Sequence, residues 1–219
     1  MFIGFATLYS MKNIEQEFKW NAASARAFEH FVQTARPVCT RLIHKNTQRI
    51  TDYYLDNKSG DFSANQVALR IRHNRQCWEA TLKSRTCLKK GLAVRQEFTL
   101  ALKGVRSLRG AMVLLNKRRK WKGVPVINLQ ERFRIRNSRR LYHCSYKNIC
   151  CELALDDYVT FAAGHQLRRR EIELELKKGN NEIFKQLVEK LSVNSGLQPA
   201  KISKVAGAEK WISQKFSLN

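Results

Sequence analysis

Residues 14–20 read IEQEFKW, a run in which charged and apolar side chains alternate. A β-strand points successive side chains to opposite faces, so Glu15, Glu17 and Lys19 share one face. The other face carries the apolar residues of the run, with one polar exception at Gln16. The stretch predicts a strand that packs with one face and presents two carboxylates and an amine with the other.

Further extended runs with the same division follow along the chain, separated mostly by Gly, Asn, Ser or Asp at turn positions. They read TRLIHKNTQRITDYYLD, QVALRIRH, CWEATLKS, LAVRQEFTLAL, ERFRIR, RRLYHC, NICCELALDD and RRREIELELKK. Their number fits a closed antiparallel barrel, whose interior at about eight strands holds one small ligand. We expect an α+β, mainly β fold, with a closed antiparallel eight-stranded barrel and a few flanking helices.

Helical periodicity is visible at 22–35 and at 180–192, and we expect one more helix within 104–120. A chain of 219 residues fits one domain better than two, and we assign it to residues 11–219. Residues 1–10 are an N-terminal extension, with Met11 as an alternative start. They are apolar but lack a basic beginning, so we expect no secretory signal. No stretch approaches the length of a membrane-spanning helix.

The composition predicts a polyanionic partner. The formal net charge is +23 and the pI is about 10.2, which creates a field that attracts nucleic acid, anionic membranes or phosphorylated small molecules. The six cysteines show no C-x-x-C spacing, so we expect reduced thiols and a cytoplasmic protein.

A basic tract stands out between Phe98 and Gln130, an interval without any acidic residue. Its middle reads NKRRKWKG, and residues 117–122 form the most exposed-looking part. One interpretation is a docking site for nucleic acid or polyphosphate, with Trp121 available for stacking. The other, which is the more common case for a charge run, is a solvated loop or helix face.

The charged faces of the strands indicate a metal-phosphate pocket. Near the end of the chain, Glu171, Glu173 and Glu175 stand in a row, and like charges on one strand face repel each other. Mg²⁺ and Mn²⁺ take carboxylate oxygens as ligands, while Arg and Lys suit phosphate oxygens. For any single strand the alternative is an ordinary amphipathic sheet that faces water. Because the same division into a charged and an apolar face recurs on six strands, we favour the pocket over that alternative.

The order of these motifs resembles a known family over roughly residues 14 to 205. The pattern E-x-E-x-K appears at Glu15, Glu17 and Lys19, followed by YYLD, VALRIR, WEATLK, VRQEF, ELALDD, EIELEL and ISK. In this respect the chain resembles the CYTH-domain proteins, the triphosphate tunnel metalloenzymes. It departs from their usual pattern in the basic insert around Lys117–Lys122 and in the NSRR stretch.

The resemblance implies roles for particular residues. Those expected to hold Mg²⁺ or Mn²⁺ are Glu15, Glu17, Glu97, Asp156, Glu171 and Glu173. Those expected to bind the phosphates are Lys19, Arg70, Arg72, Lys83, Arg95 and Lys204, together with one of Arg139 and Arg140. Spacing to Glu152 favours Arg139, whereas alternation from Arg134 and Arg136 favours Arg140. The catalytic set would be Glu15, Glu17 and Lys19.

The function implied is metal-dependent hydrolysis of a triphosphate chain, with inorganic triphosphate as the default substrate. Relatives that cyclise ATP or hydrolyse thiamine triphosphate give the alternatives among enzymes. A module that binds polyphosphate or RNA ends without turnover is the alternative from another class. The expected partner is a small polyanion, with nucleic acid a further candidate at 117–122 and no membrane. The sequence leaves the oligomeric state open.

Overall fold

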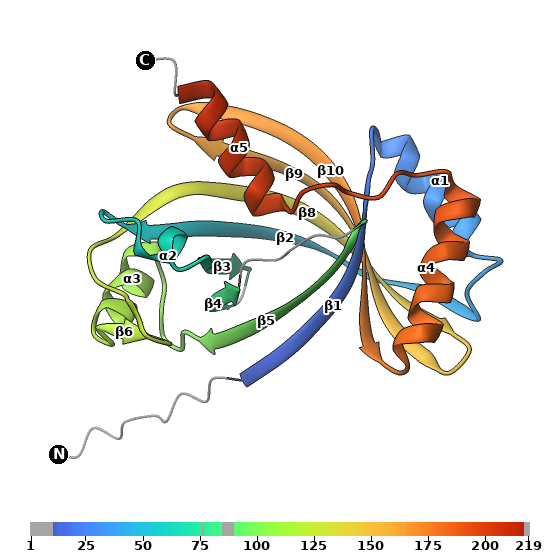
Figure 1. Ribbon diagram of the computed structural model, residues 1–219, viewed down its shortest axis with the longest axis horizontal. Helices are drawn as coiled ribbons and strands as arrows, with labels where there is room; N and C mark the ends of the chain where they lie inside the picture. The colour runs from blue at the N-terminus through green and yellow to red at the C-terminus, as the bar shows by residue number, and fades with distance from the viewer. Residues whose placement is uncertain (1–10, 76, 85–89, 217–219) are drawn as a thin grey trace.

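The computed structural model describes residues 11–75, 77–84 and 90–216, with only the backbone for residues 11–14. Its antiparallel strands close into an eight-stranded barrel in the order β1-β10-β9-β8-β2-β3-β4-β5, and β5 pairs back to β1 (Figure 1). This confirms the predicted fold class. The barrel strands are β1 (Met11–Asn21), β2 (Arg41–Asn57), β3 (Val67–Asn74), β4 (Trp78–Ser84), β5 (Leu92–Ala101), β8 (Leu129–Tyr146), β9 (Ile149–Ala162) and β10 (His165–Lys178).

The long strand β8 joins two runs that the sequence suggested as separate. The Asn-Ser pair between ERFRIR and RRLYHC has the composition of a turn, yet Asn137 and Ser138 stay in register with Tyr158 and Asp157 of β9. Asn137 is buried. Pairing with neighbours on both sides therefore overrides the local turn preference.

The three predicted helical regions are confirmed as α1 (Ala25–Ala35), α4 (Asn181–Ser195) and α3 (Leu108–Asn116). Two further helices, α2 (Asp61–Ala64) and α5 (Lys204–Phe216), were not predicted. A signal for α5 was present, because Ser203 Oγ accepts the backbone N–H of Ala206 at 3.2 Å, as a helix-capping serine does. Gly207, inside the first two turns, obscures the helical pattern.

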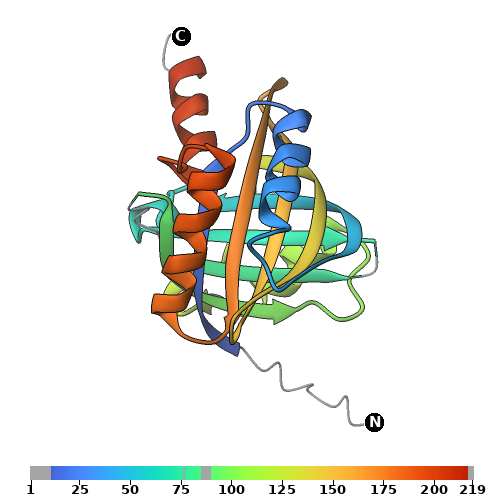
Figure 2. The ribbon, with the colours of Figure 1, turned by 90° about the vertical axis from the view of Figure 1, so that its right-hand side faces the viewer.

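Helices α1 and α4 lie against one side of the barrel (Figure 2). Their apolar faces cover the outward side chains of β1, β8, β9 and β10 in a cluster that includes Trp20, Phe31 and Phe184, all fully buried. The indole Nε1 of Trp20 also donates to Ser192 Oγ at 2.8 Å. Because Phe18 and Trp20 are fixed outward in this cluster, the alternate residues of β1 must face the barrel interior.

An insert between β5 and β8 covers a second outer face. It contains α3 and the short hairpin of β6 (Lys120–Trp121) and β7 (Val124–Pro125). Leu115 and Trp121 of the insert pack against Leu69, Ile71 and Leu100, which point outward from β3 and β5. The inward residues of β3 are therefore Arg70 and Arg72.

Helix α5 packs against inward residues instead. Val205 and Ala208 belong to a cluster with Tyr54, Phe133 and Tyr158, whose side chains point inside the barrel from β2, β8 and β9. This contact brings the first residue of the helix, Lys204, to the cavity.

The described cysteines, Cys39, Cys77, Cys144, Cys150 and Cys151, are free, as predicted, while Cys87 and residues 1–10 lie outside the described residues. None of the helices in the described ranges is both long and apolar enough to cross a membrane.

Candidate active site

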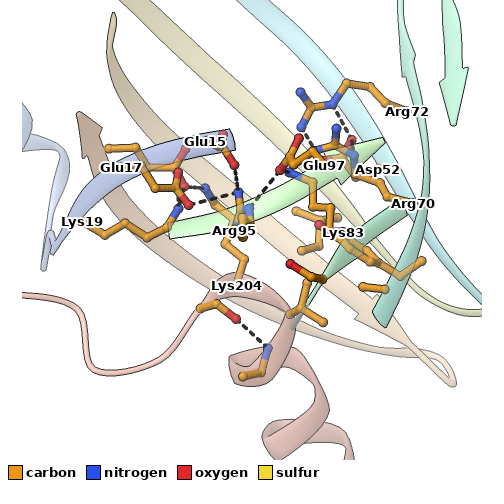
Figure 3. Close-up of a pocket in the computed structure, with 18 of the residues that line it drawn as sticks. Glu15, Glu17, Lys19, Asp52, Arg70, Arg72, Lys83, Arg95, Glu97 and Lys204 are labelled. Atoms are coloured by element: carbon orange, nitrogen blue, oxygen red, sulfur yellow. Dashed lines mark hydrogen bonds and ion pairs between the residues drawn. The ribbon is translucent and has the colours of Figure 1, made fainter. Parts of the chain in front are cut away.

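The barrel encloses a cavity of about 1320 Å³, which is lined by side chains from all eight strands and from α5. Most of the lining side chains are charged, and acidic and basic residues occur in similar numbers (Figure 3). The cavity brings together most of the predicted site. The predicted residues that line it are Glu15, Glu17, Lys19, Arg70, Arg72, Lys83, Arg95, Glu97, Arg139, Glu173 and Lys204.

The first group of contacts centres on β1 and Arg95. Lys19 Nζ lies 3.0 Å from Glu17 Oε2 and donates to Glu173 of β10. Burial alone would lower the pKa of Lys19, but Glu17 and Glu173 outweigh it and raise that pKa. Arg95 Nη2 lies 2.5 Å from Glu15 and 3.0 Å from Glu17. The strand register places Glu15 directly opposite Arg95, which explains why the two meet.

A second group lies across the cavity on β2, β3, β4 and β5. Arg72 donates two hydrogen bonds to the carboxylate of Asp52, at 2.7 and 2.8 Å, and Arg70 donates to Thr81 at 3.1 Å. Lys83 pairs with Glu97. Burial and the nearby cations Arg70 and Arg95 nevertheless lower the pKa of Lys83 to about 8, outweighing the opposite effect of its carboxylate neighbours. An anion bound beside Lys83 would raise this pKa again and so favour the charged form of the amine.

A third group joins β8, β9, β10 and α5. Arg139 donates to both oxygens of Asp156, at 2.7 and 2.5 Å, and to Glu173 at 2.6 Å. Lys204 Nζ reaches the same two carboxylates, and lies 3.4 Å from Glu171. Burial would raise the pKa of Asp156, but Arg139 and Lys204 outweigh it and hold that pKa below its usual range.

The open choice between Arg139 and Arg140 has a clear geometric outcome. Arg139 points into the cavity, whereas Arg140 points to the outer surface, where it pairs with Glu29 of α1 at 2.8 Å and stacks over Phe28. Of the two alternatives, Arg139 is therefore the one that lines the pocket, and Arg140 is not. Arg134 and Arg136 do alternate with Arg140, but the face that they share is the outer one, because Ile135 and Asn137 line the cavity.

Two predicted metal ligands, Asp156 and Glu171, are not among the residues that line the cavity. Both are buried. Asp156 is occupied by Arg139 and Lys204, and Glu171 accepts a hydrogen bond from the Tyr158 hydroxyl at 2.6 Å. In this arrangement Asp156 and Glu171 do not face the cavity but contact the cations that line it, Arg139 and Lys204.

The carboxylates that do line the cavity fit a hard divalent ion. Glu15 Oε2 and Glu17 Oε1 are buried and lie within ion-pair distance of Arg95, but neither accepts a hydrogen bond of good geometry from the described residues. Such oxygens are the donors that Mg²⁺ and Mn²⁺ take. Within the described ranges, no three His, Cys, Asp or Glu side chains converge into a ready metal site. The residues therefore suit an ion that is bound together with substrate phosphates, as Mg²⁺ commonly is.

Several cavity residues were missed by the sequence interpretation. Asp52 is the most consequential, because it is buried and anchors Arg72. It lies two residues before Tyr54, so alternation predicts that the two share a face of β2, but not that this face is the inner one. Glu79, Glu152 and Glu175 also line the cavity. They lie in the WEATLK, ELALDD and EIELEL runs, but none of the three was assigned a role in the site.

The basic tract at 117–122 lies outside this cavity. Its basic side chains are exposed, but Trp121 is only 4% exposed and belongs to the core under the insert. The suggested stacking role for Trp121 was therefore wrong.

The comparisons with known proteins agree with this geometry. A profile of the CYTH domain matches residues 13–208, which include every barrel strand apart from the first residues of β1. The chain belongs to the CYTH domain family. No match was found among curated proteins.

Solved structures share the CYTH fold of this chain at low sequence identity. HpAC1 of Hippeastrum, proposed as an adenylyl cyclase and described as having a dominant triphosphatase activity, is 20% identical, with a TM-score of 0.64 over 90% of this chain and 95% of that one. A protein of Bacillus halodurans proposed as an adenylate cyclase is 21% identical, with a TM-score of 0.57 over 94% and 98%. The mimivirus capping enzyme triphosphatase is 10% identical, with a TM-score of 0.51 over 84% and 90%. These likenesses show the fold.

Proposed function

We propose that this CYTH domain hydrolyses a triphosphate chain in a reaction that depends on Mg²⁺ or Mn²⁺, with inorganic triphosphate as the substrate. The observation that carries the proposal is the cavity itself, in which cations from β3, β4, β5, β8 and α5 face carboxylates of β1 and β10. The phosphates of a triphosphate would pair with the cations, and its metal ion would pair with the carboxylates. Phosphoryl transfer needs mainly positioning and charge neutralisation from the protein, which such a site supplies.

The residues divide into two roles under this proposal. The cations that bind phosphate oxygens are Lys19, Arg70, Arg72, Lys83, Arg95, Arg139 and Lys204. The carboxylates that would hold the metal are Glu15 and Glu17, together with Glu97, which shares Arg95 with Glu17, and Glu173, which shares Lys19 with Glu17. A bound divalent ion would add charge neutralisation and a water molecule of lowered pKa. Asp156 and Glu171 keep Arg139 and Lys204 in place.

Ligand entry would exchange partners inside the cavity. Arg95 now contacts Glu15, Glu17 and Glu97. If it turns to a phosphate, these carboxylates lose their cation, and burying them without one is costly. Glu15, Glu17 and Glu97 would then need another positive charge, which a divalent ion bound with the phosphates would supply. This coupling argues against a module that binds polyanions without turnover, since such a module gains nothing from the carboxylates.

The neighbours in fold include proteins described as triphosphatases and proteins proposed as adenylate cyclases. Cyclisation of ATP is therefore the second candidate, and hydrolysis of thiamine triphosphate the third. One assay separates them. The purified chain is incubated with tripolyphosphate, ATP, thiamine triphosphate or 5′-triphosphorylated RNA, each with Mg²⁺ or Mn²⁺, and both released phosphate and cyclic nucleotide are measured. Absence of turnover on all four would contradict the enzyme proposal.

Replacing Glu17→Gln tests the role of the β1 carboxylates. We expect phosphate release to fall by about 10²-fold or more, since a buried group that helps to stabilise the transition state is removed. The size of the side chain is kept, so the barrel should fold. Glu182→Gln is the matched control, because Glu182 is exposed on α4, where it pairs with the exposed Lys185. Equal activity of the two variants would refute the assignment.

A further inference from the structure

The insert between β5 and β8 presents a set of basic side chains that the cavity does not use. We call Arg109, Lys117, Arg118, Arg119, Lys120 and Lys122 the insert face. All six are exposed, and within the described part of the chain none of them forms an ion pair with a carboxylate. Other exposed cations, such as Arg41, Lys45 and Arg49 of β2, also form no ion pair among the residues that the structure describes. The insert face differs because its six cations lie together in residues 109–122, a stretch without Asp or Glu.

The insert face is held in a fixed position by the core below it. Leu115, Trp121 and Val124 are buried against the outer surface of β3–β5. Trp121 is buried between the exposed Lys120 and Lys122, and the buried Leu115 of α3 precedes the exposed run 117–120, so the basic side chains point to solvent. Their mutual repulsion has no carboxylate to offset it, because residues 98–130 contain no Asp or Glu. An external polyanion would relieve this repulsion.

The insert face also lies close to the entrance of the cavity. The β6–β7 hairpin packs beside α2, and α3 lies at the same end of the barrel (Figure 1). Ser63 of α2 and Gln66, which follows it, line the cavity. A phosphate-bearing chain that lay on the insert face could therefore run toward the cavity.

We propose that the insert face is a docking surface for the phosphate backbone of nucleic acid, bound without base stacking. No exposed aromatic ring is offered for stacking, since Trp121 is in the core and Lys122 Nζ covers the ring of Phe98 at 4.3 Å. Binding is therefore independent of sequence and strongly dependent on salt. An anionic membrane fits less well, because membrane-binding helices combine basic residues with a large apolar face. The insert exposes only Val113 and Ile127 among its large aliphatic residues.

A pair of matched triple variants tests this surface. The first is Lys117→Gln with Arg118→Gln and Lys120→Gln. The second is Arg41→Gln with Lys45→Gln and Arg49→Gln, which removes the same charge from an exposed stretch of β2. The probe is a single-stranded RNA of about 20 nucleotides, long enough for several phosphate contacts. It carries a 5′-hydroxyl, so the triphosphate cavity has nothing to recognise. Fluorescence anisotropy gives Kd at several salt concentrations.

We expect the insert triple to weaken RNA binding by at least about tenfold at low salt. The slope of log K against log salt should become shallower by about 2, since each lost contact to a single strand contributes about 0.7. The β2 triple should lose much less. Equal losses in the two triples would overturn the proposal, because they would show attraction to overall charge. Absence of RNA binding by the parent chain, or binding only to vesicles that contain phosphatidylserine, would also overturn it.

The inference stands or falls separately from the proposed hydrolysis. The insert triple should hydrolyse tripolyphosphate at the parent rate, and Glu17→Gln should bind the 5′-hydroxyl RNA with the parent Kd. If the insert triple lost hydrolysis together with RNA binding, the claim of a separate surface would be wrong. If no triphosphate were hydrolysed but the RNA results held, the docking surface would remain and the proposed activity would fail.

Discussion

At the scale of single residues, each of the seven cations proposed to bind phosphate contacts at least one carboxylate before any ligand arrives. Arg139 is the clearest example, with both oxygens of Asp156 and one oxygen of Glu173 as acceptors. Burial would lower the pKa of Arg139, but Asp156 and Glu173 raise it well above its usual value. The guanidinium is thus a permanent charge in a fixed orientation, which is what recognition of phosphate requires.

The adjacent arginines Arg139 and Arg140 form a natural matched pair. We expect Arg139→Met to reduce kcat/KM for the best triphosphate by about 10²-fold or more, by loss of a charged donor in the cavity. Arg140→Met should leave activity within about twofold, since it removes a surface pair with Glu29 and a contact with Phe28, both outside the cavity. Steady-state kinetics with thermal melts of both variants measures this. Similar activity losses in the two would show that Arg139 does not act through the cavity.

Asp52 links the cavity to stability at low pH. Burial would raise its pKa, but Arg72 and Arg70 outweigh burial and hold that pKa well below its usual range. The folded chain therefore keeps Asp52 ionised where the unfolded chain, with a pKa of about 3.9, already binds a proton. This contribution to stability is complete above that pH and is lost as the pH falls further.

We therefore expect Asp52→Asn to lower the free energy of unfolding by about 3 kcal/mol at neutral pH, the scale for breaking a buried ion pair. The difference from the parent chain should shrink as the pH falls below about 4. Urea unfolding at pH values from neutral to acidic would measure it. A difference that stayed constant over that range would contradict the ion-pair explanation.

At the residue scale, alternation predicted which side chains share a face but not which face is inside. The charged faces of β1, β3 and β10 were placed correctly because their opposite faces are apolar. Strand β8 has polar residues on both faces around Asn137, Ser138, Arg139 and Arg140, so nothing local distinguishes them. Pairing with β9, which sets Arg139 opposite Asp156, decides the matter. Such a long-range contact cannot be predicted from the sequence of β8 alone.

At the scale of elements, β1 is positioned by a close approach at Gly91. The carbonyl of Gly91 accepts the backbone N–H of Lys19 at 3.0 Å. Gly91 has a φ of +86°, and a Cβ there would lie 2.6 Å from the Phe18 ring and 2.9 Å from Pro199. Only glycine allows both this backbone conformation and this contact.

Gly91→Ala should accordingly destabilise the barrel and disturb Lys19. We expect a loss of about 1–2 kcal/mol from the backbone conformation and about 1–3 kcal/mol more from the steric overlap. Gly164→Ala is the matched control, because Gly164 has a φ of +79° with open space around its Cβ position, so that only the first cost applies. Urea denaturation of both variants compares them. Equal losses would show that the contact with Phe18 has no cost.

The predictability of elements followed the strength of their local signals. Helices α1 and α4 have clear apolar faces and polar caps at Ser24 and Asn180, and both were predicted. Helix α5 was missed because Gly207 interrupts its pattern. A Cβ at Gly207 would lie 2.4 Å from the terminal nitrogen of Arg169, so a larger residue there would require the end of that side chain to move.

At the scale of the whole molecule, the proposed ligand should stabilise the entire barrel. Tripolyphosphate with Mg²⁺ would connect residues from strands on opposite sides of the cavity, and a ligand at about 100 times its Kd adds about 2.7 kcal/mol. For a chain of this size that corresponds to a rise in Tm of about 5–10 °C. Mg²⁺ alone should have little effect, since the described residues include no ready metal cluster. Thermal shift measurements with each component separately and together provide the comparison. A shift with metal alone as large as with both would contradict this view.

The balance of charges inside the barrel has a consequence for turnover. The interior behaves like an ion exchanger whose fixed cations carry tethered carboxylates as counter-ions, as Lys19 carries Glu17 and Lys204 carries Glu173. Under the proposed hydrolysis, a ligand would enter by displacing these counter-ions, so it would need enough negative charge to outcompete groups that cannot diffuse away. A triphosphate with a metal ion would meet this demand, whereas the shorter fragments left after cleavage would carry less charge each. The tethered carboxylates would then return to their cations and expel the products, so that the resting ion pairs would reset the site.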